Sequence, residues 1–110
     1  MVSPTAGSVV LVTFPFSDLS YAKLRPAIVL AFAGQEDWIL CQVTSNPYSD
    51  SNAIKIDDSC FASGSLRHVS FVRPGKLFTA NTSLMKTEAG HLNFVTLQSV
   101  LDGVTAIIKG

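Results

Sequence analysis

The sequence predicts a mainly β protein, a small β-barrel that a C-terminal helix closes or flanks. Three observations predict this class. Short apolar runs alternate with turn residues, a single stretch near the C-terminus has helical periodicity, and 110 residues suffice for one modest core. We therefore expect residues 1–110 to form a single domain.

The expected strands follow the apolar runs. Three runs are apolar nearly throughout, as strands buried on both faces are: residues 8–14, 25–32 and 38–44. Shorter strands, the last of them at a sheet edge, are expected at residues 53–56, 68–73, 77–79 and 84–86. Turn-rich stretches predict loops or turns at residues 17–21, 34–37, 45–52 and 57–65. Pro15 ends the first strand, and Pro74-Gly75 closes the strand at 68–73.

The C-terminal helix is predicted by apolar residues at spacings of three and four. They are Leu97, Val100, Leu101, Val104, Ile107 and Ile108, which together form one apolar stripe. Asn93 suits the N-cap, and Lys109 with Gly110 suits the C-terminal end. Gly103 costs the helix about 1 kcal/mol relative to alanine.

Composition excludes several classes of protein. Eight Lys and Arg residues balance eight Asp and Glu residues, and the pI is 6.7, whereas domains that bind nucleic acid by bulk charge usually have a pI above about 9. A chain with 47% hydrophobic and 15% charged residues is not disordered. The sequence has no apolar run of transmembrane length and no basic segment at the N-terminus typical of a signal peptide. We expect a cytoplasmic protein without membrane contact.

Cysteine and histidine give no support for a metal or redox site. Cys41 and Cys60 lack zinc-ligand and redox spacing, so we expect two reduced thiols, at least one of them in the core. His68 and His91 are isolated from other ligand types. No phosphate-cradling glycine motif or nucleophile elbow is present. We expect no metal and no cofactor.

The charges are distributed unevenly along the chain. Two windows without an acidic residue, 19–35 and 59–87, hold six of the eight Lys and Arg residues, namely Lys23, Arg25, Arg67, Arg73, Lys76 and Lys86. If the fold brings the windows together, one face is positive although the net charge is zero, and such a face attracts a polyanion. The alternative is that these charges are scattered and solvated at strand ends.

Arginine, lysine, threonine, serine and asparagine at the loop–strand junctions can bind a phosphodiester. RNA brings its own nucleophile, the 2′-hydroxyl, so a protein needs only to orient the sugar, move protons and neutralise charge on the phosphorus. The planar guanidinium of an arginine pairs with two phosphoryl oxygens, and a hydroxyl can hold a third.

Four motifs lie in order along the chain. They are Gly7–Val12 with Phe14–Leu19, Arg25–Leu30, Cys41–Ser45 and Val72–Thr79. Together they resemble the MazF/PemK-type toxins, the ribonuclease components of type II toxin–antitoxin pairs, and the resemblance covers essentially the whole chain. It implies an SH3-like small barrel (α+β), a homodimer, and sequence-specific, metal-independent cleavage of single-stranded RNA (mRNA) to 2′,3′-cyclic phosphate and 5′-hydroxyl ends. It also implies a cognate antitoxin whose disordered tail lies in the RNA groove, with DNA contacted only indirectly through that antitoxin.

The resemblance also implies site residues. Arg25 stands at the family's catalytic Arg-Pro position, and Thr44 stands at its catalytic hydroxyl position, with Ser45 beside it. Arg73 matches a second arginine that some members use as general acid. Gly75 departs from the pattern, because some members carry an acidic base at this position.

Without that acid, the base that takes the 2′-hydroxyl proton is open. It could be Asp18, His68, or no single group in a purely electrostatic mechanism centred on Arg25. The alternative function, which Gly75 favours, is a non-catalytic SH3-like module that binds peptide or nucleic acid through the same groove. The pair Arg25 and Thr44 favours the ribonuclease.

Further RNA contacts are expected from the first loop and from residues beside the motifs. We expect RNA-binding roles for Lys23, Ser45, Ser17, Tyr21 and Lys76. The loop aromatics Phe16, Tyr21 and Tyr48 could stack on bases or pack beneath a loop. We expect four other aromatic residues in the core: Phe14, Trp38, Phe71 and Phe78.

Overall fold

The computed structural model describes residues 2–14, 23–47 and 49–110. Its strands are β1 (Ser8–Phe14), β2 (Lys23–Gly34), β3 (Asp37–Thr44), β4 (Ile54–Ile56), β5 (Phe61–Gly64), β6 (Ser70–Asn81) and β7 (Met85–Leu92). Two short 3₁₀ helices, η1 (Asp58–Cys60) and η2 (Thr82–Leu84), precede β5 and β7, and α1 (Phe94–Lys109) ends the chain. The prediction of a mainly β fold with one C-terminal α-helix is confirmed.

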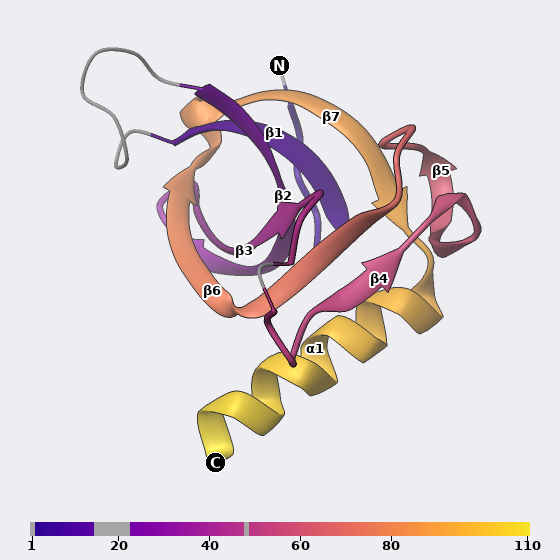
Figure 1. The fold of residues 1–110 in the computed structure, drawn as a ribbon. Helices are drawn as coiled ribbons and strands as arrows, with labels where there is room; N and C mark the ends of the chain where they lie inside the picture. Colours follow the sequence, from indigo (N-terminus) through magenta and orange to yellow (C-terminus); the bar gives the residue numbers. More distant parts are fainter. Residues whose placement is uncertain (1, 15–22, 48) are drawn as a thin grey trace.

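All seven strands form one strongly curled antiparallel sheet (Figure 1). The order is β4-β6-β3-β2-β1-β7-β5, so β4 and β5 are the edges. Ala27 of β2 lies opposite Gln42 of β3, and Gln42 lies opposite Arg73 of β6. This row across three strands places the residues of the candidate site.

Both faces of the central strands are buried, each by its own hydrophobic cluster. Val9 and Ile28 belong to a first cluster, whereas their sequence neighbours Val10 and Ala27 belong to a second. Successive side chains of a strand point to opposite faces. A strand that is buried on both faces must therefore be apolar throughout, which explains why these runs show no polar alternation.

The sequence prediction that Pro74-Gly75 closes a strand is wrong. β6 continues through both residues as a single strand of 12 residues. Its pairing with β3 passes from Leu77 to Arg73 while β3 advances by one residue, so β6 bulges between them. A bulge accommodates a proline because the residues in it do not need to donate to the ladder.

Two further predictions, one of a loop and one of an edge strand, are also wrong. The expected loop at 57–65 contains η1 and β5, and the expected edge strand at 84–86 is the start of β7, which lies inside the sheet. Exposed polar residues interrupt the apolar pattern of β7, so the sequence does not show this strand as an apolar run. Gly90 permits the close approach of β5, because a Cβ there would lie 2.5 Å from the carbonyl oxygen of Ser63.

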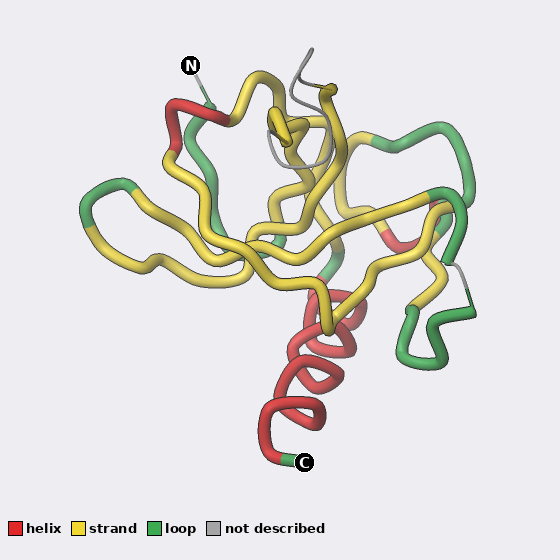
Figure 2. Tube along the Cα trace, turned by 60° about the vertical axis from the view of Figure 1, so that its left-hand side comes forward, coloured by secondary structure: helices red, strands yellow, loops and turns green. Residues whose placement is uncertain are grey.

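Helix α1 begins as predicted, at Asn93. The side chain of Asn93 accepts a hydrogen bond from the backbone N–H of Thr96 at 2.9 Å. Val100 is fully buried against the first cluster, but Ile108 in the last turn is exposed. Figure 2 shows the helix projecting away from the sheet toward the C-terminus, so the apolar stripe is only partly buried. No helix in the described ranges is long and apolar enough to span a membrane.

Candidate functional site

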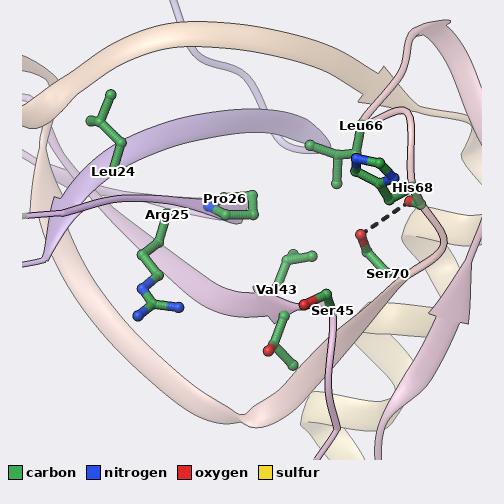
Figure 3. A pocket seen from close by; sticks show the side chains of 9 residues that line it. Leu24, Arg25, Pro26, Val43, Ser45, Leu66, His68 and Ser70 are labelled. Atoms are coloured by element: carbon green, nitrogen blue, oxygen red, sulfur yellow. Dashed lines mark hydrogen bonds between the residues drawn. The ribbon is translucent and has the colours of Figure 1, made fainter.

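A pocket of about 250 Å³ lies where β2 and β3 meet the loop that leads into β6 (Figure 3). It is lined by Leu24, Arg25, Pro26, Val43, Thr44, Ser45, Leu66, His68 and Ser70. Four of the residues named from the sequence, Arg25, Thr44, Ser45 and the candidate base His68, line the same pocket. The pocket also draws on both acid-free windows of the sequence.

The register of β2 and β3 explains why Arg25 and Thr44 share this pocket. The ladder between β2 and β3 ends at Ala27 opposite Gln42. Two further residues along each strand lead to Arg25 and Thr44, and a step of two residues keeps a side chain on the same face. The side chains of Arg25 and Thr44 therefore point to the same face of the sheet, and both line the pocket.

Arg25 is half-buried and is available to an anion. Among the described residues no carboxylate forms an ion pair with it. None of the described lining residues is acidic. A guanidinium in this setting can offer its fork of N–H donors to a phosphate.

Thr44 ends β3 with its hydroxyl held in place. Its Oγ1 accepts a hydrogen bond from the backbone N–H of Asn46 at 3.2 Å. A hydroxyl that accepts one hydrogen bond still has its own proton to donate. The Thr44 hydroxyl can therefore donate to an oxygen of a bound phosphodiester, and exposed Ser45 adds a second hydroxyl beside it.

The other wall of the pocket comes from residues 66–70. The hydroxyl of buried Ser70 donates a hydrogen bond to the carbonyl oxygen of His68 at 3.2 Å. Figure 3 shows His68 across the pocket from Arg25, with Pro26 and Val43 between them in this view. Ser70 and Leu66 were not expected as lining residues. The sequence feature that distinguishes Ser70 is that it is the one serine in the otherwise apolar stretch 69–72.

Arg73 and Lys76 lie outside the pocket and surround Asp50. The Nε atom of Arg73 donates to Oδ2 of Asp50 at 2.9 Å, and both side chains are largely buried, at 17% and 14% exposure. The hydrogen bond from Arg73, then that from the backbone N–H of Asn52, and the charge of Lys76 hold the pKa of Asp50 below its ordinary value. Arg73 nevertheless lies opposite Gln42, on the same sheet face as Thr44.

Gly75, where an acidic base was sought, is exposed and does not line the pocket. A Cβ at this position would lie 3.7 Å from Cδ1 of Ile107. A side chain at position 75 would therefore start toward the last turns of α1.

Several expected contacts lie outside the described residues. These are Phe16, Ser17, Asp18, Tyr21 and Tyr48, and also the side chains of Phe14 and Lys23. Of the remaining aromatics expected in the core, Trp38 and Phe78 are half-buried against the second cluster. Phe71 is half-buried as well.

The cysteines carry no site. Both are free, with Cys41 buried and Cys60 half-buried, as predicted. Burial raises the pKa of the Cys41 thiol to about 12, so it remains protonated at neutral pH. No group of three or more His, Cys, Asp or Glu side chains in the described part of the chain could hold a metal ion.

The chain belongs to a known toxin family. The family model of the PemK-like, MazF-like toxin of type II toxin–antitoxin systems matches residues 5–108. This confirms the resemblance drawn from the four sequence motifs. No curated protein sequence matches the chain.

Solved structures of similar proteins share the fold at low sequence identity. MazF from Deinococcus radiodurans is 17% identical, with a TM-score of 0.77 over the whole of both chains. MazF in a MazE–MazF complex from the same organism is 18% identical, with a TM-score of 0.76 over 96% of each chain. An endoribonuclease in complex with its cognate antitoxin from a mycobacterial species is 13% identical, with a TM-score of 0.73 over 99% of this chain and 96% of that one. The predicted MazF/PemK-like fold is confirmed.

Proposed function

We propose that this protein is a sequence-specific, metal-independent endoribonuclease that cleaves single-stranded RNA as the toxin of a type II toxin–antitoxin pair. One observation carries the proposal: Arg25 and Thr44, from neighbouring strands, line one pocket whose described walls contain no acidic residue. Such a pocket suits a phosphodiester. The mycobacterial protein of similar fold is named an endoribonuclease, and this chain belongs to the same toxin class by its family model.

The proposed reaction is attack of the 2′-hydroxyl oxygen of RNA on the adjacent phosphorus. Arg25 binds two non-bridging phosphoryl oxygens and stabilises the charge that grows on them in the transition state. The Thr44 hydroxyl, which the backbone N–H of Asn46 holds in place, donates to a third oxygen. The products are a 2′,3′-cyclic phosphate and a 5′-hydroxyl end.

Residues around the pocket are proposed to hold the RNA strand. Arg73 shares a sheet face with Thr44, and its ion pair with Asp50 restrains its guanidinium; we propose that it lies near the leaving group of the bound RNA. Ser45 lines the pocket, Lys76 is exposed outside it, and we propose that both contact the sugar-phosphate backbone. Lys23, Ser17 and Tyr21 are proposed to contribute further contacts from the segment that precedes Arg25.

We also propose a homodimer and a protein antitoxin as partners. Both ends of α1 expose apolar side chains, with Phe94 at 77%, Val95 at 73% and Ile108 at 69% exposure, which suits a contact between two copies. A cationic pocket suits the acidic tail of an antitoxin. Light scattering at micromolar concentration should give twice the 11.8 kDa mass of the chain. A mass near 11.8 kDa would contradict the dimer.

The ribonuclease is tested with purified protein and an unstructured RNA of mixed sequence in EDTA. We expect cleavage with cyclic phosphate ends, and Arg25→Ala should lower the rate by at least about 10²-fold. Lys109→Ala is the matched control, because it removes one positive charge from the C-terminal end of α1 and should leave the rate unchanged. Abolition of cleavage by the chelator, or an unchanged rate in Arg25→Ala, would contradict the mechanism. RNA binding without any cleavage would instead support the non-catalytic module.

A further inference from the structure

We propose that His68 is the general base that removes the proton from the attacking 2′-hydroxyl. The inference rests on the proposed ribonuclease function and names its missing proton acceptor. Within the described residues, two positions fail to supply a carboxylate base: position 75 holds glycine and faces α1, and Asp50 is engaged by Arg73 outside the pocket. Asp18, the carboxylate that the sequence offered, lies outside the described residues.

The composition of the pocket leaves one suitable group among its described lining residues. Arg25 stays protonated in proteins and cannot accept a proton. The hydroxyls of Thr44, Ser45 and Ser70 are far too weakly basic for the task. An imidazole gains and loses a proton between about pH 5 and 8 and is the side chain used most often as a general base.

His68 stands on a loop that the protein fixes at both ends. On the near side, Ser65 Oγ accepts from the backbone N–H of Arg67 at 2.8 Å and donates to Oδ1 of Asp58 at 2.6 Å. The backbone N–H of Ser65 donates to the carbonyl oxygen of Ala89 in β7 at 3.2 Å. On the far side, buried Ser70 holds the His68 carbonyl.

Arg67 is in the left-handed region, with φ of 69°. A residue other than glycine or asparagine rarely adopts this conformation, and such strain persists only where the surrounding structure enforces it. Here the two hydrogen bonds of Ser65 enforce the turn immediately before His68. The turn brings the exposed imidazole onto the pocket wall across from Arg25 (Figure 3).

Among the residues described, the His68 imidazole has no carboxylate partner, although charged residues of both signs lie on the neighbouring elements. They are Arg25 on β2, Arg67 in the loop, Lys55 on β4, Asp57 and Asp58 at η1, Arg73 on β6 and Glu88 on β7. The two η1 carboxylates accept from the hydroxyls of Ser59 and Ser65. In the described part of the chain, no acidic group forms a salt bridge with His68.

The general base acts in the cyclisation step of RNA cleavage. The neutral imidazole of His68 takes the proton of the 2′-hydroxyl while the bond from O2′ to phosphorus forms. The bond from phosphorus to O5′ breaks, its electron pair stays on O5′, and O5′ takes a proton from water. The imidazolium gives its proton to the hydroxide that this water leaves, so His68 ends the cycle neutral. Arg25 carries the transition-state charge throughout and does not change protonation.

The test compares His68→Gln with the wild type in EDTA over pH 5 to 9. Glutamine keeps polarity and approximate size without titrating. We expect kcat, the rate constant for cleavage of bound RNA, to fall by about 10²–10⁴-fold, with little change in KM. The wild-type rate should rise with pH, this rise should be absent in His68→Gln, and added imidazole should restore part of the rate of the variant. His91→Gln is the matched control. It alters the second histidine of the chain, which does not line the pocket, and it should keep the wild-type pH profile.

Two outcomes would overturn the role of His68: an unchanged rate in His68→Gln, or a lower rate that keeps the wild-type pH profile. The second outcome would show that the side chain only shapes the pocket. Both outcomes require an active wild type, so they leave the ribonuclease itself intact. A wild type that does not cleave RNA refutes the proposed function, and His68 loses its role together with it.

Discussion

Replacing Gly103 with alanine sets two physical effects of known size against each other. Gly103 lies in the middle of α1, where alanine normally stabilises a helix by about 1 kcal/mol relative to glycine. In this fold α1 passes close to β4 and β6. A Cβ at position 103 would lie 3.2 Å from Cγ and 3.5 Å from Cβ of Pro74, and 3.5 Å from Cδ1 of Ile54.

The neighbours decide which effect is larger. A contact of 3.2 Å requires one partner to move by a few tenths of an ångström. Ile54 can change rotamer, but Pro74 is fully buried and its ring has no rotamers to exchange. Overpacking of this kind costs about 1–3 kcal/mol. We therefore expect Gly103→Ala to destabilise the protein by about 1 kcal/mol once the helix gain of about 1 kcal/mol is subtracted.

Thermal and urea unfolding at one fixed protein concentration measure this effect, because a dimer makes the midpoint depend on concentration. A loss of about 1 kcal/mol should lower Tm by about 4 °C in a domain of this size. Thr105→Ala is the matched control, since it improves helix propensity at an exposed position of α1 and should raise stability by about 0.5 kcal/mol. If Gly103→Ala raises Tm as Thr105→Ala does, an added Cβ at position 103 does not overpack against Pro74, and the reasoning is refuted.

Two further predictions concern titratable groups. In the native protein a thiol reagent should modify Cys60 but not Cys41, because burial raises the pKa of Cys41 to about 12; mass spectrometry with and without urea checks this, and rapid native labelling of Cys41 would contradict it. Asp50→Asn should be less stable than the wild type at pH 7. The hydrogen bond from Arg73 lowers the pKa of Asp50 below its ordinary value of 3.8. The ionised carboxylate therefore makes its full contribution to the free energy of unfolding above pH 3.8. It is lost as pH falls through the lower pKa of the folded state. The difference in free energy of unfolding should shrink only below about pH 4, and a difference that stays constant down to pH 2 would refute the role of the ion pair.

The fold was predictable where one stretch of sequence contains the whole cause. β1, β2 and β3 are apolar on both faces, so their existence follows from composition alone. The cap of α1 at Asn93 is likewise local. By contrast, β6 passes through Pro74-Gly75 because β3 offers it a partner on both sides of the bulge. That partner lies about thirty residues earlier in the chain, and no local pattern reports it.

The site divides in the same way. Arg25 and Thr44 carried a signal through their motifs, and the β2–β3 hairpin brings them together. His68 comes from a loop whose position depends on Ser65 in the loop itself, Asp58 in η1 and Ala89 in β7. The sequence could only offer it as one of three possible bases.

The distribution of acidic residues distinguishes Arg25 from Arg73, the two arginines to which the family resemblance assigned catalytic roles. The two acid-free windows do meet, because the pocket takes Arg25 from one and His68 from the other. Arg73 comes from the same window as His68, yet the loop after β3 brings Asp50 to it at 2.9 Å. That carboxylate neutralises Arg73 locally and fixes its orientation, whereas no described carboxylate does so for Arg25. A phosphate entering the pocket therefore meets its strongest unopposed positive charge at Arg25, because a guanidinium already bound to a carboxylate gains less from a second anion. The net charge of zero conceals this local asymmetry, and the asymmetry is what makes Arg25 the centre of the proposed site.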